Sequence, residues 1–155
     1  MNIRRAKYED MQGINTLLRQ VLMVHHQGRS DIFKPNAKKY TDDELKKLIA
    51  NNNTPIFVCV EGDDVLGYAF CVFEQHINNN ILTDIKTLYI DDLCVDENVR
   101  GKHIGKHLYE YVVNFAKEYG CYNVTLNVWA CNEKAMGFYE KIGLKVQKIG
   151  MEKII

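Results

Sequence analysis

The sequence has few of the features that mark fibrous, disordered or disulfide-stabilised proteins. It holds only 2 Pro and 10 Gly in 155 residues, too few for a collagen-like or Pro-rich disordered chain. Its 5 Cys are an odd number without a C-x-x-C pair, and most lie in apolar runs, which is typical of buried thiols in a reducing cytosol. No run approaches 18 apolar residues and the N-terminus has no apolar signal segment. We therefore expect a cytoplasmic protein without a membrane partner.

Charge of one sign is also lacking. The 20 Lys and Arg balance 20 Asp and Glu, so the formal net charge is zero and the broad basic surface of a general nucleic-acid binder is not expected. Any anionic ligand has to be bound by a local group of charges or backbone donors and not by a broad basic surface. With 46% hydrophobic and 26% charged residues, the composition is that of a globular protein, and the length fits one domain over residues 1–155.

Apolar periodicity divides the chain into strands and helices. Thr41 and Glu44 form a capping box that begins one helix, and Gly120 and Gly143 are placed to end two others. The antiparallel strands come first and a strand–helix–strand crossover follows, which predicts an α/β fold with a mixed sheet and helices on both faces. The expected strands are 3–6, 55–61, 65–73, 87–95, 122–129, 144–149 and 152–155, and the expected helices are 9–28, 41–49, 104–119 and 132–141.

The segment between the strand at 87–95 and the helix at 104–119 is a candidate anion site. It reads Asp-Glu-Asn-Val-Arg-Gly-Lys-His-Ile-Gly over residues 96–105. The start of a helix offers free backbone N–H groups and the positive end of the helix dipole, which suit a phosphate or pyrophosphate. The segment is neither a P-loop nor a dinucleotide fingerprint. By itself it is equally compatible with a Gly-containing helix start that carries solvated Arg and Lys.

A second motif follows one strand later and reads Asn-Glu-Lys-Ala-Met-Gly-Phe-Tyr-Glu-Lys-Ile-Gly-Leu over residues 132–144. The pair resembles the GNAT superfamily of acetyl-CoA-dependent N-acetyltransferases, whose motifs are Arg/Gln-x-x-Gly-x-Gly/Ala and Asn-x-x-Ala-x-x-Phe-Tyr-x-x-x-Gly-Phe. Arg100 and Gly105 match the ends of the first motif, whereas His103 stands where the family most often has Gly. The second motif matches at every position except the last, where Leu144 replaces Phe.

The resemblance implies acetyl-CoA as co-substrate. No metal is expected, because His25 and His26 diverge on their helix and lack partner ligands at helical spacing. The resemblance also implies a cleft between two splayed strands, 91–95 and 122–129, in which pantetheine pairs with the backbone and the pyrophosphate meets the helix start. The side chain of His103 then has to point away from the pyrophosphate. The implied cofactor-binding residues are Leu93, Cys94, Val95, Arg100, Gly101, Lys102, His103, Ile104, Gly105, Lys106, Asn132 and Tyr139.

The reaction implied is direct transfer of an acetyl group to an amine. An alkyl ammonium has a pKa of about 10 and must lose a proton before it attacks a thioester, so a carboxylate is needed. Asp91 and Asp92 lie inside an apolar strand, where acids need an explanation. Since strand side chains alternate, we expect only one of them to face the acceptor, with Asp91 favoured as base over Asp92. Structural roles for both acids stay open. Tyr139 is the candidate acid that protonates the departing thiolate.

The acceptor is expected at the mouth covered by the first two helices and the segment 25–40, including Asp31 and Phe33. Asn127 and Trp129 would share one face of their strand and line this mouth. The acids of the region lean toward a cationic acceptor, either a small molecule or a peptide with a primary amine. The alternative function is a non-catalytic acyl-CoA-binding or regulatory domain. A homodimer is plausible, because C-terminal strands of such sheets often present an edge.

Overall fold

A computed structural model describes all residues 1–155. The strands are β1 (Asn2–Arg5), β2 (Ile56–Glu61), β3 (Asp64–Gln75), β4 (Lys86–Val95) and β5 (Asn123–Leu126). The α-helices are α1 (Met11–Gly28), α2 (Asp42–Ala50), α3 (Ile104–Glu118) and α4 (Glu133–Lys141), with short 3-10 turns η1 (Tyr8–Asp10) and η2 (Glu97–Val99). None of the helices is both long and apolar enough to span a membrane.

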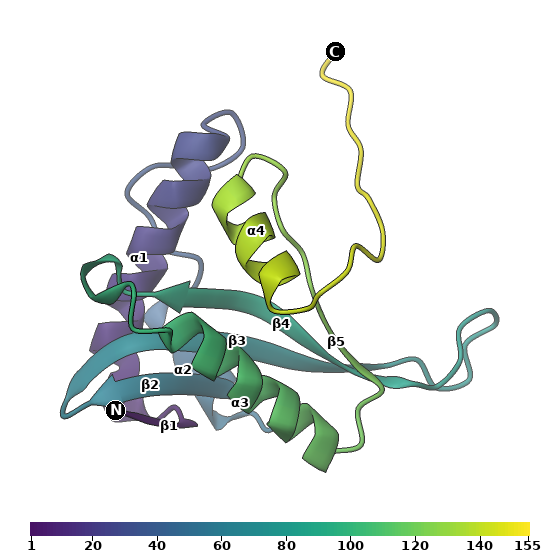
Figure 1. Cartoon of the computed structure of the whole chain (residues 1–155), viewed down its shortest axis with the longest axis horizontal. Coiled ribbons are helices and arrows are strands. Elements are labelled where there is room, and N and C mark those ends of the chain that lie inside the picture. Colours follow the sequence, from purple (N-terminus) through teal and green to yellow (C-terminus); the bar gives the residue numbers. More distant parts are fainter.

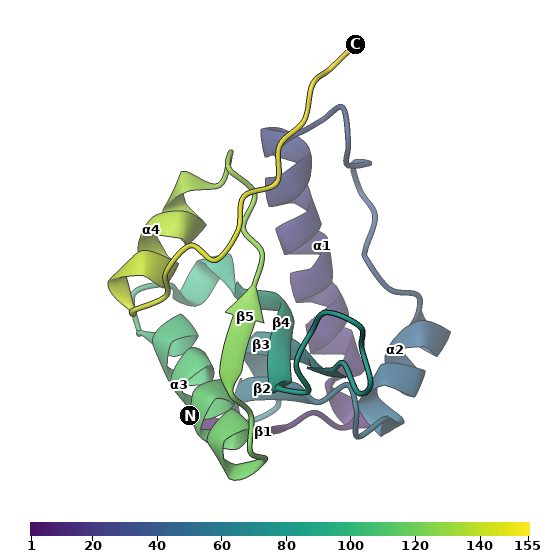
Figure 2. The same ribbon diagram turned by 90° about the vertical axis from the view of Figure 1, so that its right-hand side faces the viewer.

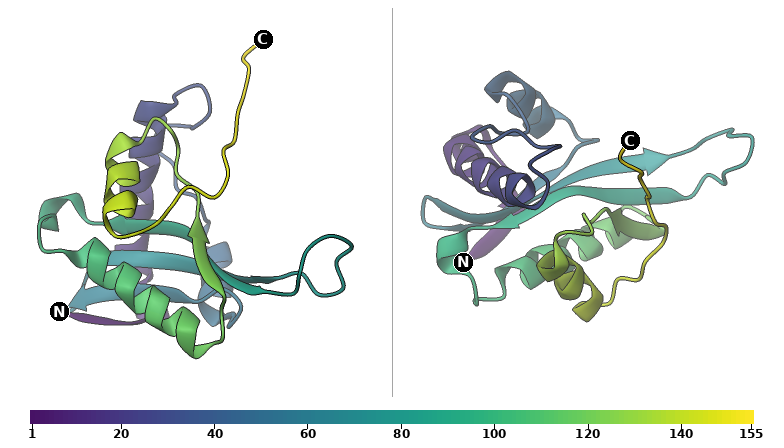
Figure 3. Two further views of the ribbon diagram at one scale, coloured as in Figure 1. Left: turned by 45° about the vertical axis from the view of Figure 1, so that its right-hand side comes forward. Right: turned by 90° about the horizontal axis from the view of Figure 1, so that it is seen from above.

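The five strands form one mixed sheet in the order β1-β2-β3-β4-β5. The first four strands pair antiparallel, whereas β5 returns through α3 to lie parallel to β4. Helices α1 and α2 cover one face, and α3 and α4 lie on the other (Figures 1 and 3). The expected α/β fold with helices on both faces is confirmed.

Alternation along the central strands supplies one apolar core to each face. Ile14, Leu17 and Leu18 of α1 pack with Tyr68 and Phe70 of β3. On the other face α3 buries one side chain in nearly every turn, at Ile104, Leu108, Val112 and Ala116, as an amphipathic helix must. The side chains of Cys59, Cys71 and Cys94 are buried in these cores, whereas Cys131 is exposed. The expectation of buried thiols therefore holds for three of the five cysteines.

Local signals set three of the helix ends. Thr41 accepts a hydrogen bond from the Glu44 backbone and Glu44 reaches back, which is the predicted capping box. Gly120 and Gly143 have positive φ angles of 72° and 103°, which Gly adopts without steric cost. Both follow the helices that they were expected to end.

Two expectations for the C-terminal third are wrong. The strand expected over 122–129 is limited to Asn123–Leu126, because β4 stops pairing with it at Ile90. The strands expected over 144–149 and 152–155 are absent, and this segment extends away from the body (Figure 1). The segment has the residue pattern of a strand but no neighbouring strand in its own chain with which to exchange hydrogen bonds.

Candidate active site

An opening in the sheet lies where β4 and β5 separate. The two strands pair from Thr87 with Asn123 to Ile90 with Leu126 and no further. From Asp91 to Val95, β4 keeps its bonds to β3 but has no strand on its other side. Its backbone therefore offers hydrogen-bond donors and acceptors toward the opening. The two strands are splayed apart as the family resemblance implied (Figure 2).

The start of α3 lies beside this opening. His103 is the N-cap residue and adopts the left-handed conformation, with φ 58° and ψ 23°. No side chain caps the helix, so the N–H groups of the first turn stay available to a ligand. Gly101 also has a positive φ, of 91°. These two left-handed residues shape the loop that leads into the α3 N-terminus.

Contacts from α1 fix the loop before α3. The Gln20 side chain donates to Asp96 at 3.3 Å and accepts from the backbone N–H of Glu97 at 3.2 Å. Asp96 also accepts from the backbone of Asn98, and these bonds hold the pKa of the Asp96 carboxyl below its usual value. The strand-to-helix connection is thus tied to the opposite face of the sheet.

A β-bulge places both acids of β4 on one face, contrary to the expectation of alternation. The register with β3 shifts between Phe70 and Cys71, so that Phe70 opposes Asp92 and Cys71 opposes Ile90. Ile90 packs in the α3 core. In a regular strand Asp92, two residues later, would point to the same face of the sheet. Asp92 instead meets Tyr68 of the α1 core. The extra residue, Asp91, reaches Tyr40, which is also on the α1 side.

The two acids differ in their partners. Asp92 accepts a hydrogen bond from the Tyr68 hydroxyl at 2.7 Å. Burial raises the pKa of Asp92 to about 6, and the Tyr68 hydrogen bond and the Lys39 charge only partly oppose this. Asp91 accepts from the Tyr40 hydroxyl and pairs with Lys39 at 2.8 Å. Asp91 therefore has two side-chain partners, whereas Asp92 is a buried carboxylate whose pKa of about 6 lies close to neutral pH.

Tyr139 reaches the same place from α4. Asn132 caps α4 by accepting from the backbone N–H of Ala135 at 3.2 Å, as expected of an N-cap Asn. Burial raises the pKa of the Tyr139 phenol, and the charge of Asp92 and the Cys94 thiol raise it further. Both of these groups belong to the α1 side, whereas α4 lies on the α3 side. Tyr139 can approach them because β5 leaves β4 after Leu126.

The two sequence motifs touch one another through a glycine. A Cβ added at Gly105 would lie 3.3 Å from the Phe138 ring and 3.5 Å from Val95. Phe138 also packs edge-on against Tyr139, with ring centroids 5.2 Å apart. The Gly of the first motif thus makes room for the Phe of the second, which sets α4 against the N-terminus of α3.

An aromatic group lines the expected acceptor mouth. Phe33 stacks on His25 with ring centroids 5.0 Å apart and packs edge-on against Trp129 at 5.2 Å. Asn127 lies apart from this group and donates to the Tyr89 hydroxyl at 3.2 Å. Because β5 ends at Leu126, strand alternation does not relate Asn127 to Trp129.

Two acids of the expected mouth, Asp31 and Asp42, are already paired. Arg29 binds Asp31 at 2.9 Å and also binds Glu152 from the C-terminal segment. Asp42 of α2 pairs with Lys38 at 2.6 Å. The mouth therefore has an aromatic wall, and its charges at Arg29, Asp31, Lys38 and Asp42 are paired with one another or with Glu152.

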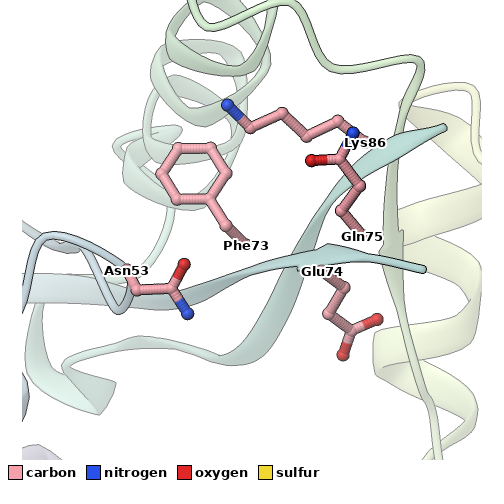
Figure 4. A pocket seen from close by; sticks show the side chains of 5 residues that line it. All are labelled: Asn53, Phe73, Glu74, Gln75 and Lys86. Carbon is pink, nitrogen blue, oxygen red and sulfur yellow. The ribbon is translucent and has the colours of Figure 1, made fainter. Parts of the chain in front are cut away.

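A surface hollow of about 440 Å³ lies elsewhere, at the far end of β3 and β4 (Figure 4). Its lining includes Asn53, Phe73 and Lys86, and the Lys86 ammonium lies 4.7 Å from the centre of the Phe73 ring. These residues contact neither acid of β4. The hollow is therefore separate from the opening between β4 and β5.

Sequence reasoning missed the partners of the two acids. Tyr40 and Lys39 precede Asp91 by about 50 residues, and Tyr68 lies on the neighbouring strand. Only the strand pairing could have indicated Tyr68, which is opposite Cys94 in the register. Nothing in the sequence indicates Tyr40 or Lys39, because they come from an irregular segment.

The fold and the site together define an α/β protein that can hold a phosphate-bearing ligand between a splayed sheet and a helix N-terminus, beside a carboxylate and a phenol. The Acetyltransferase (GNAT) family model matches residues 23–144. The chain belongs to this family and is an acetyl-CoA-dependent N-acetyltransferase.

Named relatives are N-acetyltransferases with different acceptors. A peptidyl-lysine N-acetyltransferase of Salmonella typhimurium is 27% identical over 147 residues, covering 94% of this chain and 84% of the relative. A glucosamine 6-phosphate N-acetyltransferase of Arabidopsis thaliana is 32% identical over 117 residues, covering 73% and 76%. A solved mutant protein from Bacillus halodurans is 29% identical, with a TM-score of 0.95 and coverage of 100% and 99%.

Proposed function

We propose that the chain transfers acetyl from acetyl-CoA directly to the primary amine of an alkyl ammonium acceptor, as in a lysine side chain of a peptide or a small molecule of that type. The observation that carries the proposal is the pairing of two groups beside the opening between β4 and β5: Asp92, whose burial raises its pKa to about 6, and the phenol of Tyr139, whose pKa the charge of Asp92 raises. A base and an acid at one point are what amide formation from a thioester requires.

The residues of the opening fit acetyl-CoA. The uncapped N–H groups of α3 suit the pyrophosphate, with Arg100, Lys102 and Lys106 as nearby cations. The free edge of β4 at Leu93, Cys94 and Val95 suits the amide groups of pantetheine. Acetyl-CoA supplies an activated acyl group, and the remaining steps below belong to the side chains.

Asp92 is the better base of the two acids, whereas the sequence alone led us to favour Asp91. With a pKa of about 6, Asp92 is ionised at neutral pH and accepts a proton more readily than an ordinary carboxylate does. Tyr68 orients it through the 2.7 Å hydrogen bond. Asp91 serves instead to anchor Lys39 and Tyr40, which close one side of the mouth.

Tyr139 acts as the acid. Its raised pKa keeps the phenol protonated at physiological pH, so it can donate to the thiolate that leaves when the amide forms. Asn132 and Gly105 position Tyr139 indirectly, the first by capping α4 and the second by making room for Phe138.

The charges at the mouth favour an alkyl ammonium over a phosphorylated amino sugar. A phosphate ester needs free cations, but Arg29 is bound by Asp31 and Glu152, and Lys39 is bound by Asp91, which leaves Lys34 as the unpaired cation of this segment. The wall of His25, Phe33 and Trp129 suits an alkyl chain that ends in an ammonium group.

Thiol release with matched acceptors tests the proposal. We expect kcat/KM for a blocked lysine peptide or a lysine analogue to exceed that for glucosamine 6-phosphate by at least about tenfold, equivalent to about 1.4 kcal/mol. The reverse preference would contradict the assignment of the acceptor. Calorimetric binding of CoA without thiol release for any amine would favour the non-catalytic acyl-CoA-binding alternative.

A further inference from the structure

The side chain of Lys39 places an alkyl ammonium group in the candidate site. Lys39 belongs to the segment between α1 and α2, which contains no helix or strand and leads from the end of α1 to α2 (Figure 2). The Nζ atom of Lys39 lies 2.8 Å from Oδ2 of Asp91. The β-bulge puts Asp91 on the same face of the sheet as Asp92. The chain therefore holds an ammonium group of its own beside the two acids of β4.

The charge of Lys39 acts on both sides of the mouth. Burial raises the pKa of Asp92 to about 6, and the charge of Lys39 opposes this rise. Burial lowers the pKa of His25, which stacks on Phe33, and the charge of Lys39 lowers it further. Because a charge shifts a pKa in this way only at short range, the ammonium group lies near the proposed base and near the aromatic wall.

The contact between Lys39 and Asp91 can be exchanged at small cost. The two side chains expose 44% and 21% of their surface, and an ion pair that is open to water contributes little to stability. Asp91 also accepts a hydrogen bond from the Tyr40 hydroxyl, and the Tyr40 ring stacks on Phe70 with centroids 5.4 Å apart. Tyr40 can therefore hold the Asp91 carboxylate in place when Lys39 leaves it.

The segment between α1 and α2 has attachments other than Lys39. Lys38 pairs with Asp42 of α2 at 2.6 Å and donates to Asn15 of α1 at 3.0 Å. These contacts and the stacking of Tyr40 tie the segment to both helices and to the sheet. The ion pair of Lys39 is thus not required to hold the segment against the body of the protein.

We infer that Asp91 binds the ammonium group of the acceptor and that Lys39 occupies this position until the acceptor displaces it, an inference that rests on the proposed transfer to an alkyl ammonium. The alkyl chain of the acceptor lies along His25 and Phe33, and its ammonium group replaces that of Lys39. Asp92, the next residue, takes the proton that the ammonium group must lose before the amine attacks. Asp91 thereby selects cationic acceptors, and Lys39 is their internal competitor.

Kinetics with Nα-acetyl-lysine amide as acceptor separate a competitor from a tether. Lys39→Met removes the charge and keeps an unbranched side chain, so KM should fall about two- to fivefold while kcat changes less than about twofold. Lys46→Met removes an exposed charge from α2 and is the matched control, with KM expected to change less than about 1.5-fold. An equal or higher KM in Lys39→Met would overturn the inference, because loss of a tether would have that effect.

Asp91→Asn tests whether the two ammonium groups share one carboxylate. Asn keeps the shape of the side chain without its charge, so KM for the same acceptor should rise at least about tenfold. In this background Lys39→Met should change KM less than about 1.5-fold, because the common partner is already lost. A two- to fivefold fall of KM in the double variant would place the effect of Lys39 elsewhere and overturn the inference.

Lysine labelling tests the displacement without turnover. With CoA in place of acetyl-CoA, saturating Nα-acetyl-lysine amide should raise the rate of reductive methylation at Lys39 relative to Lys46 at least about threefold, because Lys39 is released from Asp91. The amide of Nα-acetyl-norleucine, which has the alkyl chain without the ammonium group, should leave this ratio unchanged. A ratio that stays constant or falls with the lysine compound would overturn the inference.

The two arms also separate this inference from the proposed function. Thiol release with the lysine compound together with a constant labelling ratio would overturn the role of Lys39 alone. Absence of thiol release with every amine would contradict the proposed function, and the labelling ratio would still decide whether an acceptor ammonium displaces Lys39.

Discussion

At the scale of single residues, adjacent acids with the same side chain have different environments. Asp91 is bound by an ammonium and a phenol, and Asp92 by one phenol in a buried position. Burial opposes the ionised form of Asp92, and the single hydrogen bond does not compensate. Environment, not residue type, decides which of the two can take a proton near neutral pH.

Asp92→Asn should reduce kcat by at least about 100-fold, since a general base contributes 10²–10⁴ in rate. In the wild type the rate should rise as the pH passes about 6, where Asp92 ionises, and the variant should lose this limb. Asp91→Asn is the control and should keep the limb. Steady-state thiol release from pH 5 to pH 8 measures both, and a limb that follows Asp91 would reassign the base.

The same shift predicts a stability effect. The folded-state pKa of about 6 lies above the ordinary 3.8, so between these values the native state binds more protons than the unfolded state. The free energy of unfolding should therefore fall as the pH rises through this window, by roughly 3 kcal/mol at about 1.4 kcal/mol per pKa unit. Urea unfolding at pH 4 and pH 7.5 checks this, and Asp92→Asn should abolish most of the difference.

Tyr139→Phe should lower kcat about 100-fold while leaving the affinity for CoA within about threefold, because only the proton donor is removed. The phenyl ring keeps the contact with Phe138. Thiol release and calorimetry on the same preparation separate the two effects. Loss of CoA binding together with rate would instead identify Tyr139 as a binding residue.

At the scale of elements, the connection from β4 to α3 is strained at one residue. His103 has φ 58° without a side-chain cap, a conformation that costs a residue with a Cβ about 1–2 kcal/mol. The family most often has Gly there, which adopts this conformation freely. The positive φ explains the preference for Gly at this position, and His103 adopts the same φ with the strain energy of a residue that has a Cβ.

His103→Gly should raise the free energy of unfolding by up to about 1 kcal/mol, because relief of strain exceeds the greater entropy of the unfolded Gly chain. Lys102→Gly is the matched control, since Lys102 does not have a positive φ and its replacement should destabilise. Urea unfolding of the three proteins measures the difference. A destabilised His103→Gly would mean that the imidazole makes a favourable contact.

At the scale of the whole molecule, acetyl-CoA should join elements that the protein alone links weakly. α4 buries no residue completely, and β5 pairs with β4 over four residues. A ligand held by the free edge of β4 and the α3 N-terminus stabilises the folded state by about 2.7 kcal/mol at 100 times its dissociation constant.

Hydrogen exchange should show where this stabilisation acts. We expect saturating acetyl-CoA to slow exchange at least about tenfold at those N–H groups of residues 93–95 that point away from β3 and at residues 104–106, because these groups face the ligand. The amides of β1 and β2, on the far side of the sheet, are the internal control. Uniform slowing across the sheet would contradict a ligand site localised at the opening.

The sequence by itself determined the local elements and the order in which they follow. The capping box at Thr41, the glycines after α3 and α4, and the apolar spacing of α3 act within a few residues. Such short-range signals need no knowledge of neighbours in space. The crossover from β4 through α3 to β5 and the two family motifs were accessible for the same reason.

Only the tertiary structure decided how those elements meet. The extra residue at Asp91 turns the side chain of Asp92 to the other face of the sheet, and no residue pattern in the sequence predicts a bulge of this kind. Lys39 reaches Asp91 over 52 positions and Arg29 reaches Glu152 over 123, contacts that no local pattern encodes. The length of β5 and the outward course of residues 145–155 depend on hydrogen-bond partners, which are set by strand pairing in space.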